Sequence, residues 1–156
     1  MRYLLEALLI GTAAAGGWML AAPSGPSARP VAAAADEAPA REFRFCHTGG
    51  GRDCVVDGDT FWMDGQKIRV ADIDAPETHP ARCPEEARLG EAATRRLQAL
   101  LSAGPVTLVT PERATDRYGR ALRIVTRGGK SLGEQLVAEG LARRWTGRRQ
   151  PWCATA

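Results

Sequence analysis

The stretch DCVVDGDTFWMDGQKIRVADI, residues 53–73, decides the fold. Residues 53–63 and residues 66–73 are strand-like segments, and Asp64-Gly65 stands between them. An Asp-Gly pair at this place is a strong signal for a two-residue hairpin turn, because both residues tolerate a positive φ. The stretch therefore predicts two antiparallel strands joined by a tight turn.

Two helices and further strands surround this hairpin. A stripe of alanine and leucine side chains from residue 85 to residue 101 predicts a long helix, which Gly104-Pro105 would end. Ser131 with Glu134 three residues later is a capping-box pattern, and it predicts a second helix that ends near Gly140. The other predicted strands are residues 42–46, 106–110, 120–127 and 141–145, and the proline-rich residues 75–84 are a predicted loop.

The size and the order of these elements indicate the fold class. The 156 residues, 44% hydrophobic and 25% charged, suffice for one globular domain with a single core. About five strands, with a long helix between the third and the fourth, predict an α+β fold that is mainly β. This order favours a closed, five-stranded barrel of the oligonucleotide-binding (OB-fold) kind with two helices.

The N-terminal residues are expected to lie outside this domain. Residues 7–22 are almost wholly apolar or small, which is short for a membrane span and typical of the core of a signal peptide. We therefore expect a signal peptide at residues 1–22, with an uncleaved membrane anchor through residues 3–22 as the alternative. Residues 23–40, rich in Pro, Ala and Ser, predict a flexible linker to the domain at residues 41–156. In both cases the domain is exported, and it would be periplasmic, secreted or membrane-anchored.

Four cysteines fit an exported domain. An even number of cysteines in such a chain predicts disulfides, and Cys46, Cys54, Cys83 and Cys153 allow three connectivities. Spacing favours a Cys46–Cys54 pair around a glycine-rich loop, which leaves Cys83 for Cys153. A zinc site is the alternative, but the chain has no C-x-x-C motif and only two histidines.

Acidic and basic side chains divide between two parts of the domain. Residues 53–91 hold ten acidic side chains against four basic ones, and residues 113–156 hold ten basic side chains against three acidic ones. Grouped carboxylates without histidine or cysteine suit a hard cation such as Ca²⁺ or Mg²⁺, and arginines suit phosphate oxygens. The combination points to phosphodiester hydrolysis, although charge alone equally fits two faces that neutralise each other.

Three motifs carry a resemblance to a known family. They are Asp57-Gly58-Asp59-Thr60, the segment from Ile68-Arg69 to Asp74-Ala75-Pro76-Glu77, and Asp116-Arg117-Tyr118-Gly119-Arg120-Ala121-Leu122. In this order and spacing they resemble the staphylococcal nuclease (thermonuclease) family, and the similarity runs over residues 55–145. The resemblance implies a monomeric, Ca²⁺-dependent nuclease of DNA and RNA that prefers single strands. Such an enzyme breaks the P–O5′ bond and leaves 3′-phosphate ends.

The resemblance also implies a role for each residue of the motifs. Asp59 and Asp74 would be carboxylate ligands of Ca²⁺, and the carbonyl of Ala75 would coordinate the same ion. Glu77 would hold the attacking water and act as the general base. The implied phosphate contacts are Arg69 and Arg120 at the scissile phosphate, with Arg117 and Tyr118 beside the terminal phosphate of the bound nucleotide.

The chain departs from the family pattern just beyond residue 142. The tyrosines usual just beyond residue 142 are replaced by Arg143-Arg144-Trp145-Thr146-Gly147-Arg148, so base stacking would fall to Tyr118, Trp145 or Trp152. The arginines at 143, 144, 148 and 149 alone predict a solvated basic surface that gathers nucleic acid.

A non-catalytic nucleic-acid-binding OB-fold module is the alternative function. Such a module should lack at least one of the five expected site residues. All five are present, and they are Asp59, Arg69, Asp74, Glu77 and Arg120. The nearby Asp57 is expected to be structural, because an Asp-Gly-Asp turn needs a side chain that bonds backbone N–H groups.

Overall fold

The computed structural model describes residues 41–47 and 50–154 of the chain. The expected signal peptide or anchor and the expected linker, residues 1–40, lie outside the described residues. Within the described part, no helix is both long and apolar enough to cross a membrane.

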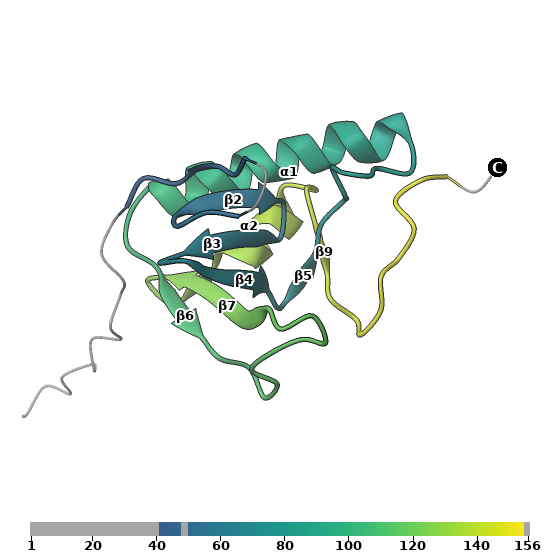
Figure 1. Cartoon of the computed structure of the whole chain (residues 1–156). Coiled ribbons are helices and arrows are strands. Elements are labelled where there is room, and N and C mark those ends of the chain that lie inside the picture. The colour runs from purple at the N-terminus through teal and green to yellow at the C-terminus, as the bar shows by residue number, and fades with distance from the viewer. Residues whose placement is uncertain (1–40, 48–49, 155–156) are drawn as a thin grey trace, which may run out of the picture. The chain divides into compact units, whose positions relative to one another are not determined.

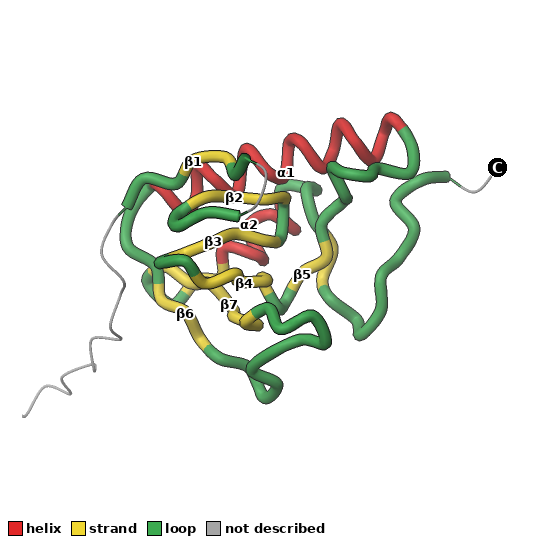
Figure 2. The backbone as a smooth tube through the Cα atoms, in the orientation of Figure 1, coloured by secondary structure: helices red, strands yellow, loops and turns green. Residues whose placement is uncertain are grey.

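The described residues form short strands and two helices (Figures 1 and 2). The helices are α1 (Pro84–Ser102) and α2 (Leu132–Ala138). The strands are β1 (Arg44–Phe45), β2 (Cys54–Asp57), β3 (Thr60–Met63), β4 (Gln66–Val70), β5 (Ile73–Asp74), β6 (Thr107–Val109), β7 (Ala121–Arg127), β8 (Lys130–Ser131) and β9 (Arg143–Arg144). The predicted α+β class, mainly β with two helices, is confirmed.

Most strands belong to one mixed sheet with the order β1-β2-β3-β4-β7-β6. The predicted hairpin is its centre, with Phe61 opposite Ile68 and Met63 opposite Gln66 on antiparallel β3 and β4. Strand β7 then lies parallel to β4, and β5 pairs with β9 in a separate two-stranded ladder. The strand pairs of the described residues therefore form an open path that ends at β1 and β6. The closure that a barrel needs is not present among them.

Two of the predicted strands are broken by turns. The prediction of one strand over residues 53–63 is wrong, because a turn at Gly58 and Asp59 separates β2 from β3. This turn lies tightly against α1, where a Cβ at position 58 would come within 2.6 Å of the Cβ of Ala93. The predicted strand over residues 66–73 is broken at Ala71 and Asp72, where Ser131 Oγ donates to Asp72 Oδ2 over 2.6 Å. This bond ties the turn to the start of α2.

Helix α1 packs against β2 and runs past the sheet (Figure 1). Leu97 and Leu101 are fully buried on it, and the core continues with Phe43, whose ring meets Phe61 edge to face at 5.9 Å. Helix α1 begins at Pro84, where the missing N–H of proline costs no hydrogen bond. The predicted N-cap of α2 is confirmed, since Ser131 Oγ accepts from the N–H of Glu134 at 3.1 Å.

Two disulfides tie the domain together. Cys46 bonds to Cys54, and Cys83 bonds to Cys153 across 70 residues of sequence. This is the connectivity that spacing favoured. Because every described cysteine is in a disulfide, the zinc alternative is wrong.

Candidate active site

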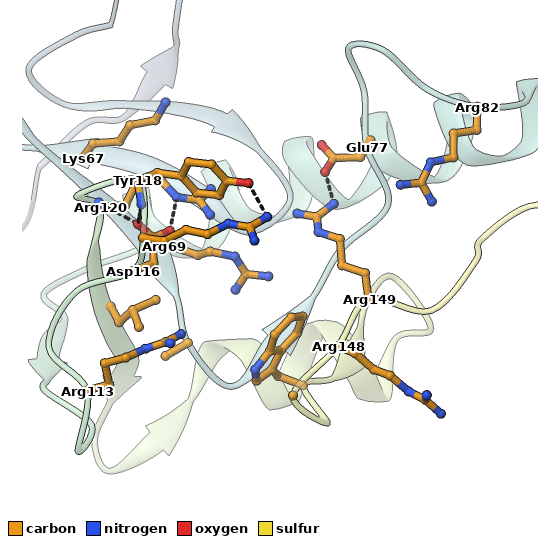
Figure 3. A pocket seen from close by; sticks show the side chains of 15 residues that line it. Lys67, Arg69, Glu77, Arg82, Arg113, Asp116, Tyr118, Arg120, Arg148 and Arg149 are labelled. Atoms are coloured by element: carbon orange, nitrogen blue, oxygen red, sulfur yellow. Dashed lines mark hydrogen bonds and ion pairs between the residues drawn. The ribbon is translucent and has the colours of Figure 1, made fainter.

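The expected site residues meet where the central hairpin faces the loop after β5. Arg69 on β4 pairs in register with Thr60 on β3, and Asp59 directly precedes Thr60 in the β2–β3 turn. Strand β5 ends at Asp74, so the break before it turns this carboxylate back toward Arg69. A pocket of about 940 Å³ opens beside this hairpin (Figure 3). Of the expected site residues, those that line it are Arg69, Glu77, Arg117, Tyr118 and Arg120. Asp59 and Asp74 contact Arg69 but are not part of the lining.

A buried guanidinium lies between two buried carboxylates. Asp59, Asp74 and Arg69 are only 2%, 3% and 6% exposed. Arg69 Nη2 lies 3.1 Å from Asp59 Oδ2 and 3.6 Å from Asp74 Oδ1. Its Nη1 donates to the carbonyls of Val70 at 2.6 Å and Ile73 at 3.0 Å. These bonds fix the plane of the guanidinium, so its remaining edge faces the carboxylates.

The two aspartates differ in how well their oxygens are satisfied. Asp59 Oδ1 accepts from Thr60 Oγ1 at 2.9 Å, and Asp59 Oδ2 accepts from the N–H of Ala75 at 3.1 Å. In Asp74 neither carboxylate oxygen has a hydrogen-bond partner, although both are buried. Burial raises the pKa of Asp74, and the charges of Arg149 and Arg69 oppose this effect. Asp74 Oδ1 is met only by the longer ion pairs to Arg149 at 3.5 Å and Arg69 at 3.6 Å. Buried carboxylate oxygens that accept no hydrogen bond are available as ligands of a cation.

Asp57 adds a further acidic group behind this pair. Its Oδ1 accepts from the N–H of Asp59 at 3.1 Å, which is the structural role expected of it in the turn. Burial, together with the Asp59 carboxylate, raises the pKa of Asp57 to about 7. The raised pKa values of Asp57 and Asp74 indicate that these buried carboxylates are crowded, even with Arg69 and Arg149 beside Asp74. The donor set, all carboxylate oxygen, fits a hard divalent cation held by Asp59 and Asp74.

Glu77 lies on the loop that follows β5, and helix α1 supports this loop. A Cβ at Gly90 of α1 would stand 2.7 Å from the carbonyl oxygen of Glu77 and 2.9 Å from that of Pro76. Only glycine lets the helix approach the loop this closely. The Glu77 carboxylate forms an ion pair with Arg149, which also places its Nε 3.5 Å from Asp74 Oδ1 (Figure 3).

Arg120 comes from the other side of the pocket. Its Nε donates to Asp116 Oδ2 at 2.6 Å, and its Nη1 donates to Thr60 Oγ1 at 3.4 Å. Burial alone would raise the pKa of Asp116, but the hydrogen bonds from Arg120 and from the N–H of Tyr118 hold it below its ordinary value. Asp116 therefore stays charged, holds the turn through the N–H groups of Tyr118 and Arg120, and also orients the Arg120 side chain.

Aromatic side chains stand beside these arginines. Tyr118 is 68% exposed, and its ring centroid lies 4.7 Å from the guanidinium carbon of Arg117 and 5.5 Å from that of Arg120. The ring of Trp145 lies 5.2 Å from the guanidinium carbon of Arg69. Both rings line the pocket and are open to solvent, which is where a base platform would have to be.

The structure places Arg69, Glu77 and Arg120 on one pocket, while Asp59 and Asp74 are buried against Arg69 and apart from Glu77. Among residues 41–47 and 50–154, one group of three ligating side chains has its ligand atoms within 4.8 Å of one another, namely Cys83, Glu86 and Cys153. Its two sulfurs are joined in a disulfide, so that group holds no metal. Asp59 and Asp74 are gathered around Arg69, and Glu77 is held by Arg149.

Sequence reasoning missed Arg149, which was expected only as part of a solvated surface. A signal was nonetheless present in the sequence. Cys83 stands six residues after Glu77, and Arg149 stands four residues before Cys153. A Cys83–Cys153 bond therefore returns the tail to the loop of Glu77.

Known proteins resemble the chain over a stretch that contains most of these residues. A family model described as staphylococcal nuclease homologue matches residues 67–153, a stretch that includes Arg69, Asp74, Glu77 and Arg120. The chain is 38% identical over 97 residues to "Endonuclease YncB" of Bacillus subtilis (strain 168), over 58% of this chain and 45% of that protein.

Two other curated proteins match over similar stretches. Identity is 38% over 97 residues to "SPbeta prophage-derived endonuclease YokF" of the same organism, over 58% of this chain and 32% of the relative. It is 32% over 96 residues to "Succinoglycan biosynthesis protein ExoI" of Rhizobium meliloti (strain 1021), over 59% of this chain and 50% of the relative. The matches thus span half or less of the length of these relatives.

Proposed function

The chain belongs to the staphylococcal nuclease family, and from this premise we propose that it is a nuclease that hydrolyses phosphodiester bonds of DNA and RNA. Two of the relatives described above are named endonucleases. The observation that carries the proposal is the meeting of Asp59, Arg69 and Asp74 in one buried cluster, with Glu77 and Arg120 on the same pocket.

We propose Ca²⁺ as the cofactor, held by the carboxylates of Asp59 and Asp74 with the Ala75 carbonyl. Two buried aspartates and the unsatisfied oxygens of Asp74 support a hard cation at this place. When bound, such an ion neutralises charge that accumulates on the phosphate oxygens during hydrolysis. Mg²⁺ and Mn²⁺ have the same preference for oxygen ligands and belong in the same test.

Glu77 is the proposed general base. Its carboxylate is partly open to the pocket and forms an ion pair with the guanidinium of Arg149. It would take a proton from the water whose oxygen attacks phosphorus. The P–O5′ bond then breaks, the 5′ oxygen leaves and takes up a proton, and the product ends in a 3′-phosphate.

Arg69 and Arg120 would stabilise the negative charge that develops on the phosphate. Both are oriented before substrate arrives, Arg69 by backbone carbonyls and Arg120 by Asp116. Donors fixed in advance need no reorganisation as the charge develops. In other enzymes, removing one such donor lowers the rate by roughly 10²–10³. Arg117 and Tyr118 on the same turn are the proposed contacts to the terminal phosphate of the nucleotide.

The pocket supports a single-stranded substrate. Its lining includes the cations Lys67, Arg82, Arg113, Arg117, Arg148 and Arg149. Basic grooves with exposed aromatic rings bind unpaired bases by stacking and follow the phosphates by charge. The two disulfides support an exported, oxidising location for this activity, as a secreted, periplasmic or anchored monomer.

The test is cleavage of a 5′-labelled single-stranded oligodeoxynucleotide by the oxidised chain, in millimolar Ca²⁺ and then in chelator. Cleavage that needs the metal and yields 3′-phosphate ends supports the proposal. Parallel reactions with single-stranded RNA, with Mg²⁺ and with Mn²⁺ define the substrate and the metal. Binding without cleavage under every condition would favour the non-catalytic OB-fold-like module instead.

A further inference from the structure

The segment after β9 folds back over the active-site pocket. Residues 145–154 form no helix or strand (Figure 2). Arg143 Nη1 donates to the carbonyl of Pro151 at 2.9 Å, and its guanidinium carbon lies 3.8 Å from the ring centroid of Trp152. Cys153 is then bonded to Cys83, at the start of α1. We call residues 145–153 the tail segment.

Arg149 is the residue through which the tail segment reaches the reaction centre. It pairs with the proposed base Glu77 and lies 3.5 Å from Asp74, the proposed metal ligand. Its side chain is still 34% exposed and lines the pocket. Figure 3 shows Arg149 and Arg148 on one side of the pocket, and Arg120 and Tyr118 on the opposite side. The pocket therefore has cations on two opposite sides.

Arg149 is paired with the carboxylates of Asp74 and Glu77, and in the proposed mechanism these carboxylates also bind the metal ion and the attacking water. A cation bound at Asp74 and a water held by Glu77 would each weaken the pull of these carboxylates on the guanidinium. A guanidinium has five N–H donors in a planar fork that matches two phosphate oxygens. Arg149 contacts the proposed base Glu77, so a strand whose scissile phosphate lies beside that base would bring a phosphate within reach of Arg149.

We propose that Arg149 is a further substrate-binding residue, which contacts a phosphate of the nucleic acid on the tail side of the pocket and is held in place by the Cys83–Cys153 disulfide. The inference rests on the proposed function, since it assigns a second phosphate contact to the same site. The disulfide matters because the tail segment has no regular structure of its own. Its covalent link to the loop region of Glu77 limits where Arg149 can go.

The first test is the binding of a fluorescein-labelled single-stranded oligothymidylate to the oxidised chain in Ca²⁺. All proteins carry Glu77→Gln, so the probe is not cleaved. Arg149→Ala should weaken binding by about tenfold at 0.1 M salt, since it removes a hydrogen-bonded charge contact. The slope of log affinity against log salt should fall by about 0.7, the value for one phosphate contact on a single strand.

The matched control is Arg95→Ala, which removes the same charge from an exposed i,i+4 pair on α1. Its affinity and salt slope should equal those of the parent. Unchanged affinity and slope in Arg149→Ala, or an equal loss in both variants, would overturn the proposal. Cleavage by the otherwise unmodified chain is measured separately, so a protein that binds through Arg149 but never cleaves refutes only the proposed function.

The second test addresses the disulfide with a double-mutant cycle. Cys83→Ser/Cys153→Ser should weaken binding about as much as Arg149→Ala, and the combined variant should be no weaker than either, because both changes remove one contact. Cys46→Ser/Cys54→Ser breaks the disulfide that joins the residue after β1 to β2, and it should leave the affinity unchanged.

Circular dichroism and the melting temperature verify that each variant folds. If the Cys83/Cys153 variant does not fold, the Arg149→Ala result alone decides whether Arg149 contacts the substrate. Additive losses in folded proteins would contradict the anchoring role.

Discussion

Arg69 Nη2 lies 3.1 Å from Asp59 Oδ2, and the side chains of both residues are almost completely buried. A buried ion pair contributes little net stability when it forms, but removing one partner leaves the other charge buried and uncompensated. Here the loss of Arg69 would affect two carboxylates, because Asp74 faces the same guanidinium and would keep Arg149 as its ion-pair partner. The pair therefore links the stability of the fold to the charge balance of the site.

Arg69→Met should destabilise the chelator-treated protein by about 3–5 kcal/mol. The methionine keeps much of the apolar stem but removes the guanidinium from Asp59 and leaves Asp74 paired with Arg149. Urea unfolding with and without Ca²⁺ measures the effect, and Ca²⁺ should recover part of the loss. Arg120→Met serves as the comparison. Because Arg120 is more exposed than Arg69, its replacement should lower the free energy of unfolding by less. Equal stability of Arg69→Met and the parent in chelator would contradict the burial argument.

The metal-free protein should become less stable as the pH rises from about 5 to 8. The pKa of Asp57 is raised to about 7 and that of Asp74 is also raised, so the folded state binds these protons more tightly than the unfolded state. Such a group makes its full contribution to the free energy of unfolding when the pH is below its pKa in the unfolded chain. The contribution is lost as the pH rises through its pKa in the folded protein. We expect a loss of about 2 kcal/mol over this range. Unfolding in chelator at a series of pH values measures it.

The pKa values of Asp116, Glu134 and Glu139 are lowered. Their stability contribution is lost only as the pH falls below about 4, so they do not mask this trend. Asp57→Asn keeps the oxygen that accepts from the N–H of Asp59 and should flatten the pH profile. A profile that is equally steep in this variant would show that other groups are responsible.

Arg149→Ala should bind Ca²⁺ more tightly than the parent when no nucleic acid is present. The arginine occupies the carboxylates of Asp74 and Glu77, and a metal ion has to compete with it. Removing a partly exposed ion pair of this kind is worth about 1 kcal/mol, or roughly fivefold in affinity. Isothermal titration calorimetry measures it. Arg148→Ala is the control for long-range charge and should change the affinity less. Weaker binding in Arg149→Ala would contradict the competition.

Gly90→Ala should reduce cleavage at least tenfold, although alanine is the better helix former by about 1 kcal/mol. The added methyl group would stand 2.7 Å from the carbonyl of Glu77, so the loop that carries the proposed base has to move. A displacement of this size at a catalytic group lowers the rate more than the stability. Rates and melting temperatures are compared with those of Arg88→Ala on the exposed side of α1. An active Gly90→Ala with a raised melting temperature would show that the contact does not position Glu77.

Local patterns predicted much of the fold and most of the site. Asp64-Gly65 and Ser131 dictate their turn and cap by local chemistry, and the three motifs predicted which side chains would gather. The break after Val70 was not predictable, because it depends on the bond from Ser131, the N-cap of α2, to Asp72. The open path of the sheet was not predictable either, because it depends on the pairing of β4 with β7, which are far apart in the sequence. The roles of Gly90 and Arg149 depend on contacts across 13 and 72 residues, and neither has a periodic signal.

The most direct test of the account compares the oxidised chain with its Glu77→Gln variant on one labelled single-stranded oligodeoxynucleotide in Ca²⁺. The amide keeps the size of the carboxylate but accepts no proton from water. We expect cleavage to fall by at least 10² while the oligonucleotide still binds. A variant that cleaves at the parental rate would contradict the assignment of Glu77 as the base of this site.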